Sequence, residues 1–435
     1  MILSHAICYA LPMRLFSAAA AAFTAERLAA LRSAVPSTNN HIHMNAAGAS
    51  PSTAAVINAI TSHLHLETAE GGYAAAAQAA DVTEEVYKSV TRLISASSPK
   101  EIALHDSSTT SFTFGIHSVP LHNSSIFVSA SSTEYASNSI AMLKHSASCG
   151  TPPPRFLLNT PEGLDLKRLY DVIVDGPHEV SAVVLTHAPT NGGVVNDAVA
   201  LGKMLRDLPP NVTRPLYLVD ACQSIGQLEI NVQEIGCDIL AGTSRKWLRG
   251  PRGVGFMYVR QEAMSRLLEP HMLDLHGATW TTEMDYDVDA TARRYEFWES
   301  SVANRLGFGA AVDLALEIGV PNIQERVRML SDMMREGVEK EAGYKCMDMK
   351  GGGITPRSGI CSFDPSPMSA DFVVSEMQKR GISISASGRT STLIDANARG
   401  LQKLIRVSPH YFNTEEEVKE TIDALKSIRE QYFSS

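Results

Sequence analysis

The 435-residue sequence has few cysteines, and none of them is arranged as a paired motif. There is no Cys-x-x-Cys pair, and the six cysteines are scattered at Cys8, Cys149, Cys222, Cys237, Cys346 and Cys361. This spacing argues against a zinc ribbon and a disulfide scaffold, so we expect no metal site. It is typical of a protein from a reducing compartment.

The sequence also lacks a basic excess and a long apolar run. Its 38 Lys and Arg residues against 47 Asp and Glu residues give a net charge of −9, so we expect no nucleic-acid partner. No uninterrupted apolar run reaches about 18 residues, so we expect no membrane span. A content of 44% hydrophobic and 20% charged residues is instead typical of a globular chain.

The N-terminal 25 residues carry a single charged side chain, Arg14. An acidic-poor segment with Arg and Ser is typical of a transit peptide. A secretory signal is a second interpretation, although Pro12 and Arg14 interrupt its apolar run, and a frayed Ala-rich helix is a third. We treat residues 1–25 as an extension that can carry targeting information, and we expect a cytoplasmic or organellar protein.

The middle of the chain alternates short apolar runs with amphipathic stretches. The runs are β-branched or aromatic and end at turn residues, which predicts strands at Ile126–Ser129, Ala182–Thr186, Tyr217–Asp220, Ile239–Gly242 and Phe256–Val259. Helical periodicity fits Val86–Leu93, Val199–Leu205 and Ile323–Val338. This order predicts an α/β fold with a parallel sheet, which binds ligands at the carboxyl ends of its strands.

The pattern changes at about residue 345. Strands are predicted at 359–363, 382–385 and 404–408, with a helix at 369–380. A last helix begins at a capping box formed by Thr414 and Glu417. We expect a small α+β domain here, connected to the larger one by a long helical stretch over residues 303–342.

The segment from residue 216 to 260 combines residues that can carry chemistry. Asp220 ends one predicted strand and Lys246 follows the next, so both should lie on one rim of the sheet. An ion pair is the simplest interpretation. The same two groups are what pyridoxal phosphate needs, a lysine for the Schiff base and an aspartate for the pyridinium nitrogen.

One stretch within that segment has the sequence VDACQSIGQLEINVQEIGCDILAGTSRKWLRGPRGVGFMYV. It resembles the active-site signature of class V pyridoxal-phosphate enzymes, the cysteine desulfurase-like aminotransferases, desulfurases, epimerases and lyases. The resemblance runs from Met44 to Glu417. It implies a fold-type-I transferase with a large, mostly parallel-sheet domain over residues 26–320, whose N-terminal arm contributes to the small α+β domain at 321–435. It also implies a homodimer and a small amino-acid substrate.

The resemblance assigns roles within the signature. Lys246 matches the Schiff-base lysine, and Asp220 matches the partner of the pyridinium nitrogen. Gln223 is expected near the phenolate oxygen of pyridoxal 5′-phosphate. Thr243 and Arg245 stand at phosphate-binding positions and can donate to a phosphate.

Further cofactor contacts are expected in three turns. Ser108 and Thr109 lie at a predicted helix N-terminus and are candidates for the phosphate, although an ordinary N-cap cluster is the alternative. Tyr135 stands where desulfurases carry a histidine stacked on the ring, and its phenol can also move protons. Thr190 or Asn191 is expected at the ring oxygen.

Two candidates lie further along the chain. Arg406 matches the family arginine that binds the substrate carboxylate through a bidentate fork. Ser300 can serve where many relatives supply a threonine to the phosphate of the neighbouring subunit, although Glu299 precedes it in a departure from the family pattern.

A second departure concerns the nucleophile of the desulfurases. Their cysteine lies on a loop that corresponds to Ala386–Thr392, which contains none here. Serine and threonine cannot replace a persulfide-forming thiolate. Cys361 is expected to be a buried small hydrophobe, and Cys222 to face away from Asp220 and Gln223.

Several motifs resemble the branch that includes the hercynylcysteine sulfoxide lyases of ergothioneine synthesis, around residues 71–73, 294–299, 391–395 and 407–414. This weaker resemblance implies C–S bond cleavage by β-elimination, with Lys246 as general base and Tyr135 as the acid for the leaving sulfur. A class V aminotransferase acting on a small amino acid is the alternative. A desulfurase and a non-catalytic cofactor-binding protein fit the motifs less well.

Overall fold

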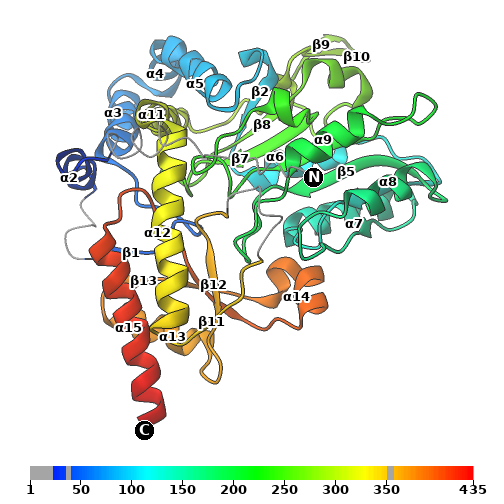
Figure 1. Ribbon diagram of the computed structural model, residues 1–435. Helices are drawn as coiled ribbons and strands as arrows, with labels where there is room; N and C mark the ends of the chain where they lie inside the picture. The colour runs from blue at the N-terminus through cyan, green and yellow to red at the C-terminus, as the bar shows by residue number, and fades with distance from the viewer. Residues whose placement is uncertain (1–22, 36–40, 350–356, 435) are drawn as a thin grey trace, which may run out of the picture.

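The computed structural model describes residues 23–35, 41–349 and 357–434, and most of the N-terminal extension lies outside these ranges. A seven-stranded sheet forms the centre of the larger part (Figure 1). Its strands follow the order β2-β8-β7-β6-β5-β3-β4. Their bounds are β2 (Ile102–His105), β3 (Ser125–Ser129), β4 (Arg155–Phe156), β5 (Glu179–Thr186), β6 (Leu216–Asp220), β7 (Ile239–Thr243) and β8 (Gly255–Val259). All five strands predicted for this region are present.

The sheet is mostly parallel, as expected. Strands β4, β3, β5, β6 and β7 pair in parallel, whereas β8 is antiparallel to both β7 and β2. The carboxyl ends of β5 and β6 are in register, with Thr186 opposite Asp220. Parallel pairing therefore brings the residues that follow these strands to one edge of the sheet.

Helices cover both faces of this sheet. Along β6, Tyr217 and Val219 belong to one buried cluster and Leu216 and Leu218 to another, because successive side chains of a strand point to opposite faces. Because both faces of the strand are buried, its sequence is a continuous hydrophobic run. The first face packs against α5 (Ala80–Ile94), α8 (Leu166–Val174), α9 (Ala198–Arg206) and α11 (Val302–Ile318), and the second against α6 (Ser108–His117) and α7 (Ala136–Cys149).

The remaining elements of the larger part lie around this core. A hairpin of two antiparallel strands, β9 (Ala278–Thr282) and β10 (Asp285–Val288), projects beyond the sheet. The other helices are α2 (Ala25–Ser33), α3 (Ala54–Glu70), α4 (Gly72–Gln78) and α10 (Val232–Ile235).

A four-stranded antiparallel sheet of order β11-β12-β15-β14 organises the C-terminal part. Its strands are β11 (Lys345–Cys346), β12 (Cys361–Asp364), β14 (Ser385–Ser387) and β15 (Leu404–Val407). Strand β1 (Ile42–His43), near the N-terminus, pairs in parallel with β13 (Ile382–Ser383). The helices are α13 (Ala370–Lys379), α14 (Leu393–Arg399) and α15 (Glu415–Ser434).

The predicted capping box begins α15. The Glu417 amide donates to Thr414 Oγ1 at 3.2 Å, and the Thr414 amide donates to Glu417 Oε2 at 3.1 Å. The start of this helix is therefore confirmed.

The expected long helical stretch at 303–342 is two helices. Helix α11 ends at Ile318, α12 (Val320–Lys340) follows, and the pair bends by 81°. Gly319 makes the bend with φ of +88°, a conformation that favours glycine. Within the described ranges no single helix has the length and apolar character to cross a membrane, although this bent pair passes that test jointly.

Helix α12 links the two hydrophobic cores. Val320 and Ile323 near its start belong to the core of the large sheet, and Met334 and Val338 belong to that of the small sheet. Figure 1 shows the helix running from one part to the other beside α15.

We expect Gly319→Ala to lower the free energy of unfolding by about 1–3 kcal/mol, because a side chain strains the backbone at this φ. The control is Gly72→Ala, since Gly72 lies in α4 with nothing within 4 Å of an added Cβ. Denaturant unfolding of both variants measures the difference. Equal stability of Gly319→Ala and the native chain would show that the bend needs no glycine.

Candidate active site

A cavity opens at the carboxyl edge of the large sheet. The predicted residues meet there from segments far apart in the sequence, and all of them except Asn191, Ser300 and Arg406 line it. The lining comprises Ser107, Ser108, Thr109, Tyr135, Thr186, Ala188, Thr190, Asp220, Cys222, Gln223, Thr243, Arg245 and Lys246. Strand ends supply Thr186, Asp220 and Thr243, so the sheet itself positions this set.

Asp220 is a buried carboxylate held by two donors. Its Oδ1 accepts from the Cys222 amide at 2.8 Å, and its Oδ2 accepts from Asn138 Nδ2 at 2.8 Å. Only 4% of the residue is exposed. A buried charge needs such partners, and the hydrogen bonds fix the direction in which the carboxylate faces.

Lys246 lies in the turn after β7 and faces the same cavity. Burial lowers the pKa of its amine, while the nearby Asp220 opposes the shift. A lower pKa leaves more of the amine neutral, and the neutral amine is the form that attacks a carbonyl. Lys246 and Asp220 therefore line one cavity, and their roles as Schiff-base lysine and pyridinium partner stay a prediction.

The amide of Gln223 has a defined orientation. Trp247 Nε1 donates to its Oε1 at 3.0 Å, and its Nε2 donates to the Ala47 carbonyl at 3.1 Å. An amide nitrogen carries two hydrogens, so one donor remains on a residue that lines the cavity. This geometry agrees with the predicted role of Gln223 as a hydrogen-bond donor.

Hydroxyl groups cluster at the N-terminus of α6. Ser107 Oγ accepts from the Thr110 amide at 3.1 Å and so caps the helix. Ser107 is therefore the residue that caps the helix, and the N-cap alternative does not apply to the side chains of Ser108 and Thr109. A Cβ at Gly255 would lie 2.3 Å from the Ser108 amide, so only glycine allows β8 to pass behind this turn.

The expectation that Cys222 faces away from the site is wrong. Its thiol lines the cavity and donates to Ser108 Oγ at 2.7 Å. Residue 222 lies in the turn directly after β6, and the bond from its amide to Asp220 Oδ1 keeps it beside that carboxylate. Burial raises the pKa of the Cys222 thiol to about 12, so it stays protonated at neutral pH and is a poor nucleophile.

Arg406 reaches the site from the small sheet. Its Nη1 donates to Thr190 Oγ1 at 2.6 Å and to the Thr190 carbonyl at 3.3 Å, and its Nε donates to Ser385 Oγ at 3.2 Å. Burial lowers the pKa of its guanidinium to about 10. Thr190 thus binds Arg406, the residue predicted to hold the substrate carboxylate. Its neighbour Asn191 donates instead from Nδ2 to Thr392 Oγ1 at 3.5 Å.

The segment that replaces the desulfurase cysteine loop begins in the small sheet and contacts the larger part through Thr392, whose hydroxyl accepts from Asn191. It forms β14 and a 3₁₀ turn at Arg389–Thr392, followed by α14, and the Asp395 amide donates to the Ser132 carbonyl at 3.0 Å. Cys361, in contrast, is fully buried in β12, as expected. Neither of these two segments therefore provides a thiol that could replace the missing nucleophile.

Ser300 lines a second cavity, together with Asp106, Thr110, Glu299 and Arg305. Its expected contact is with a phosphate in the neighbouring subunit, which a single chain does not test, so this role stays a prediction. The cavity adjoins the α6 turn, because Thr110 belongs to that helix and Asp106 precedes it.

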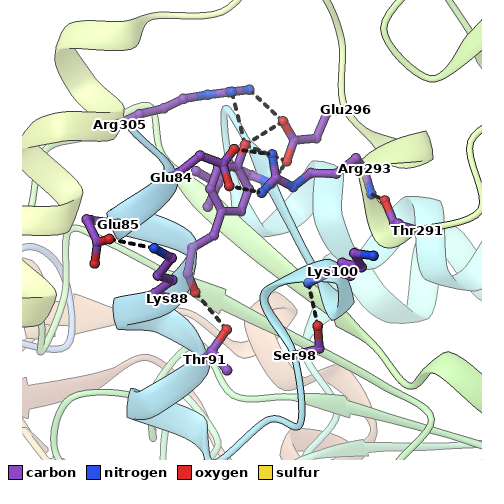
Figure 2. A network of polar contacts seen from close by, with 12 residues as sticks. Glu84, Glu85, Lys88, Thr91, Ser98, Lys100, Thr291, Arg293, Glu296 and Arg305 are labelled. Carbon is purple, nitrogen blue, oxygen red and sulfur yellow. Dashed lines mark hydrogen bonds and ion pairs between the residues drawn. The ribbon is translucent and has the colours of Figure 1, made fainter. Parts of the chain in front are cut away.

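A buried polar network supports this second cavity (Figure 2). Glu296 accepts from the Tyr87 hydroxyl at 2.9 Å and the Leu104 amide at 2.8 Å, and it pairs with Arg305 at 3.1 Å. Arg293 lies over the Tyr87 ring, 3.3 Å from its centroid. The network therefore ties the segment before Ser300 to β2 and α5.

Comparisons with known proteins decide the family. Residues 42–421 match the family model described as aminotransferase class-V. The chain belongs to the class-V aminotransferase family. A probable cysteine desulfurase of Methanothermobacter thermautotrophicus is 25% identical over 92% of this chain and 97% of its own. A probable hercynylcysteine sulfoxide lyase of Mycobacterium tuberculosis is 27% identical over 88% and 89%.

Solved structures agree on the fold. The cysteine desulfurase of Thermococcus onnurineus superposes with a TM-score of 0.82 at 21% identity, over 93% of this chain and 98% of its own. A cystine C–S lyase superposes with a TM-score of 0.79 at 20% identity, over 90% and 99%. This class-V enzyme uses pyridoxal 5′-phosphate. The cavity fits that group, since Lys246 and the buried Asp220 both line it and the hydroxyls of Ser108 and Thr109 line it at α6.

The lowered pKa of Lys246 predicts its reactivity in cofactor-stripped protein. The neutral amine persists to lower pH when the pKa falls, so Lys246 should react with pyridoxal at pH values at which surface lysines are protonated. Lys167 is the internal control, because its hydrogen bond to Asp171 raises its pKa. Borohydride reduction and peptide mapping across pH measure both. Identical pH profiles for the two lysines would contradict the assignment.

Proposed function

We propose that this class-V enzyme is a C–S lyase that eliminates the sulfur substituent of a cysteine-derived amino acid or its sulfoxide. Hercynylcysteine sulfoxide is the named candidate. The observation that carries the proposal is the convergence of Lys246, Asp220 and Tyr135 on one cavity, beside a segment at 386–392 that has no cysteine. The similarity to a probable hercynylcysteine sulfoxide lyase supports this choice.

Lys246 and Arg406 have separate roles in the proposed reaction. Pyridoxal phosphate, when bound, would supply an electron sink that makes the Cα proton of the substrate acidic. Arg406 binds the substrate carboxylate and thereby orients Cα toward Lys246, which removes its proton. The C–S bond then breaks, and the sulfur leaves with the bonding electrons.

We assign the protonation of the leaving sulfur to Tyr135. It is 39% exposed at the edge of the cavity, so it can meet the substituent that extends from the substrate. The three-carbon remainder takes up water to give pyruvate and ammonia. A desulfurase would instead transfer sulfur to a protein thiolate, for which Cys222 is unsuited by its raised pKa.

An aminotransferase acting on a small amino acid is the second candidate, and the family relationship favours it. It would use Lys246, Asp220 and Arg406 in the same way, but it would retain the β-substituent. A non-catalytic role is disfavoured, since a binding protein has no need to keep these three groups together.

Pyruvate release tests the reaction. We expect pyruvate from S-substituted cysteine sulfoxides, with Tyr135→Phe slower by about 10²–10⁴-fold through loss of the proton donor. A lactate dehydrogenase assay measures the rate, and alanine, which carries no sulfur, is the control substrate. The absence of pyruvate from every sulfoxide and thioether offered would overturn the lyase proposal.

We also propose a homodimer, in agreement with the family resemblance. The β9–β10 hairpin leaves large apolar side chains in solvent, with Trp280 78% exposed and Met284 93% exposed. Exposed apolar side chains gathered in this way are typical of an interface.

We expect the double variant Trp280→Ser, Met284→Ser to shift the protein toward monomer, because it removes the apolar contact. Phe433→Ser is the control, as Phe433 is 63% exposed at the far end of α15. Sedimentation velocity measures the mass. A native chain that sediments as a monomer would reject the dimer, and an unchanged dimer in the double variant would reject this surface.

A further inference from the structure

A second carboxyl group is buried beside Asp220. Glu134 lies just before α7 and is 2% exposed, while Asp220 at the end of β6 is 4% exposed. The two are close enough for the charge of Asp220 to raise the pKa of Glu134, although burial is the larger cause. Two adjacent buried carboxyl groups are costly, so their arrangement needs an explanation.

Asn138 joins the two carboxyl groups. Its Nδ2 donates to Glu134 Oε1 at 2.8 Å and to Asp220 Oδ2 at 2.8 Å. An amide nitrogen has two hydrogens, and both are used here. A flipped amide would place its oxygen against both carboxyl groups, so the orientation of Asn138 is fixed.

Glu134 is held in turn by neutral donors. Its Oε1 accepts from Thr186 Oγ1 at 2.5 Å and from the Tyr135 amide at 3.1 Å, and its Oε2 accepts from the Thr186 amide at 3.2 Å. The backbone and Asn138 N–H groups can only donate, so they oppose the effect of burial on the pKa of Glu134 and stabilise its ionised form. In the described part of the chain, each hydrogen-bond partner of Glu134 is an amide or a hydroxyl. The burial of this carboxyl group is therefore not explained by a salt bridge.

We propose that Glu134 and Asn138 are positioning residues that act on the cofactor through Asp220. The chain Glu134–Asn138–Asp220 places a second negative charge behind the carboxylate that faces the ring nitrogen. In a buried site that charge makes Asp220 a stronger partner for a protonated nitrogen. The Glu134 carboxylate also accepts from the Tyr135 amide. It therefore positions Tyr135, the residue proposed to protonate the leaving sulfur.

Two substitutions test this arrangement. Glu134→Gln removes the charge with little change in shape, and Asn138→Ala removes the bridge. Ser139→Ala is the matched control, because Ser139 lies on the same helix and donates only to the Tyr135 carbonyl. Asp220→Asn is the positive control for loss of the pyridinium partner.

The readout is the ¹⁵N NMR shift of ring-labelled pyridoxal phosphate bound to each variant, followed across pH without substrate. We expect the ring nitrogen to lose its proton at lower pH in Glu134→Gln and Asn138→Ala, and the cofactor to bind about 10-fold more weakly. Ser139→Ala should match the native protein. Circular dichroism of each variant identifies any that has not folded, and only folded variants enter the comparison.

An unchanged ring-nitrogen titration in both folded variants, or an equal change in Ser139→Ala, would overturn the proposal. The experiment needs bound cofactor but no turnover, so its failure would leave the lyase proposal standing. Conversely, a protein that releases no pyruvate can still show the predicted titration.

Discussion

The site depends on one constraint, the common edge at which the parallel strands β5, β6 and β7 end. That edge brings Thr186, Asp220 and the turn of Lys246 together in a place where apolar strands and helices exclude water. Charges placed there are costly unless they are bonded, which explains the two donors on Asp220 and the lowered pKa of Lys246.

The small sheet completes the site from the other side, and Trp247 connects the two parts. Its indole orients Gln223, and its carbonyl oxygen lies 3.0 Å from Nε2 of His410, just beyond the strand that carries Arg406. The residue next to Lys246 therefore contacts both Gln223, which lines the cavity, and the segment that follows β15 of the small sheet. A substrate carboxylate on Arg406 and an amine at Lys246 would then be held at a fixed separation.

The family resemblance predicted most of the residues that line the cavity. The sheet explains why Asp220 and Thr243 are among them, since residues at the carboxyl ends of parallel strands share an edge. The resemblance did not predict Glu134 and Asn138, which act through another residue and show no pattern of their own beside Tyr135. The position of Cys222 was predicted wrongly, because the turn held by its amide on Asp220 Oδ1 brings the thiol to Ser108 and depends on contacts between distant segments. The bend at Gly319 was missed because helical periodicity continues on both sides of it.

We propose that Lys246 and Asp220 serve an elimination that regenerates the starting enzyme. The most direct measurement follows the cofactor absorbance and the ammonia released while the protein consumes a cysteine sulfoxide completely. We expect the starting spectrum to return, with ammonia and pyruvate formed in equal amounts. Conversion of the cofactor to its amine form, with a keto acid that retains its sulfur and no free ammonia, would contradict this proposal.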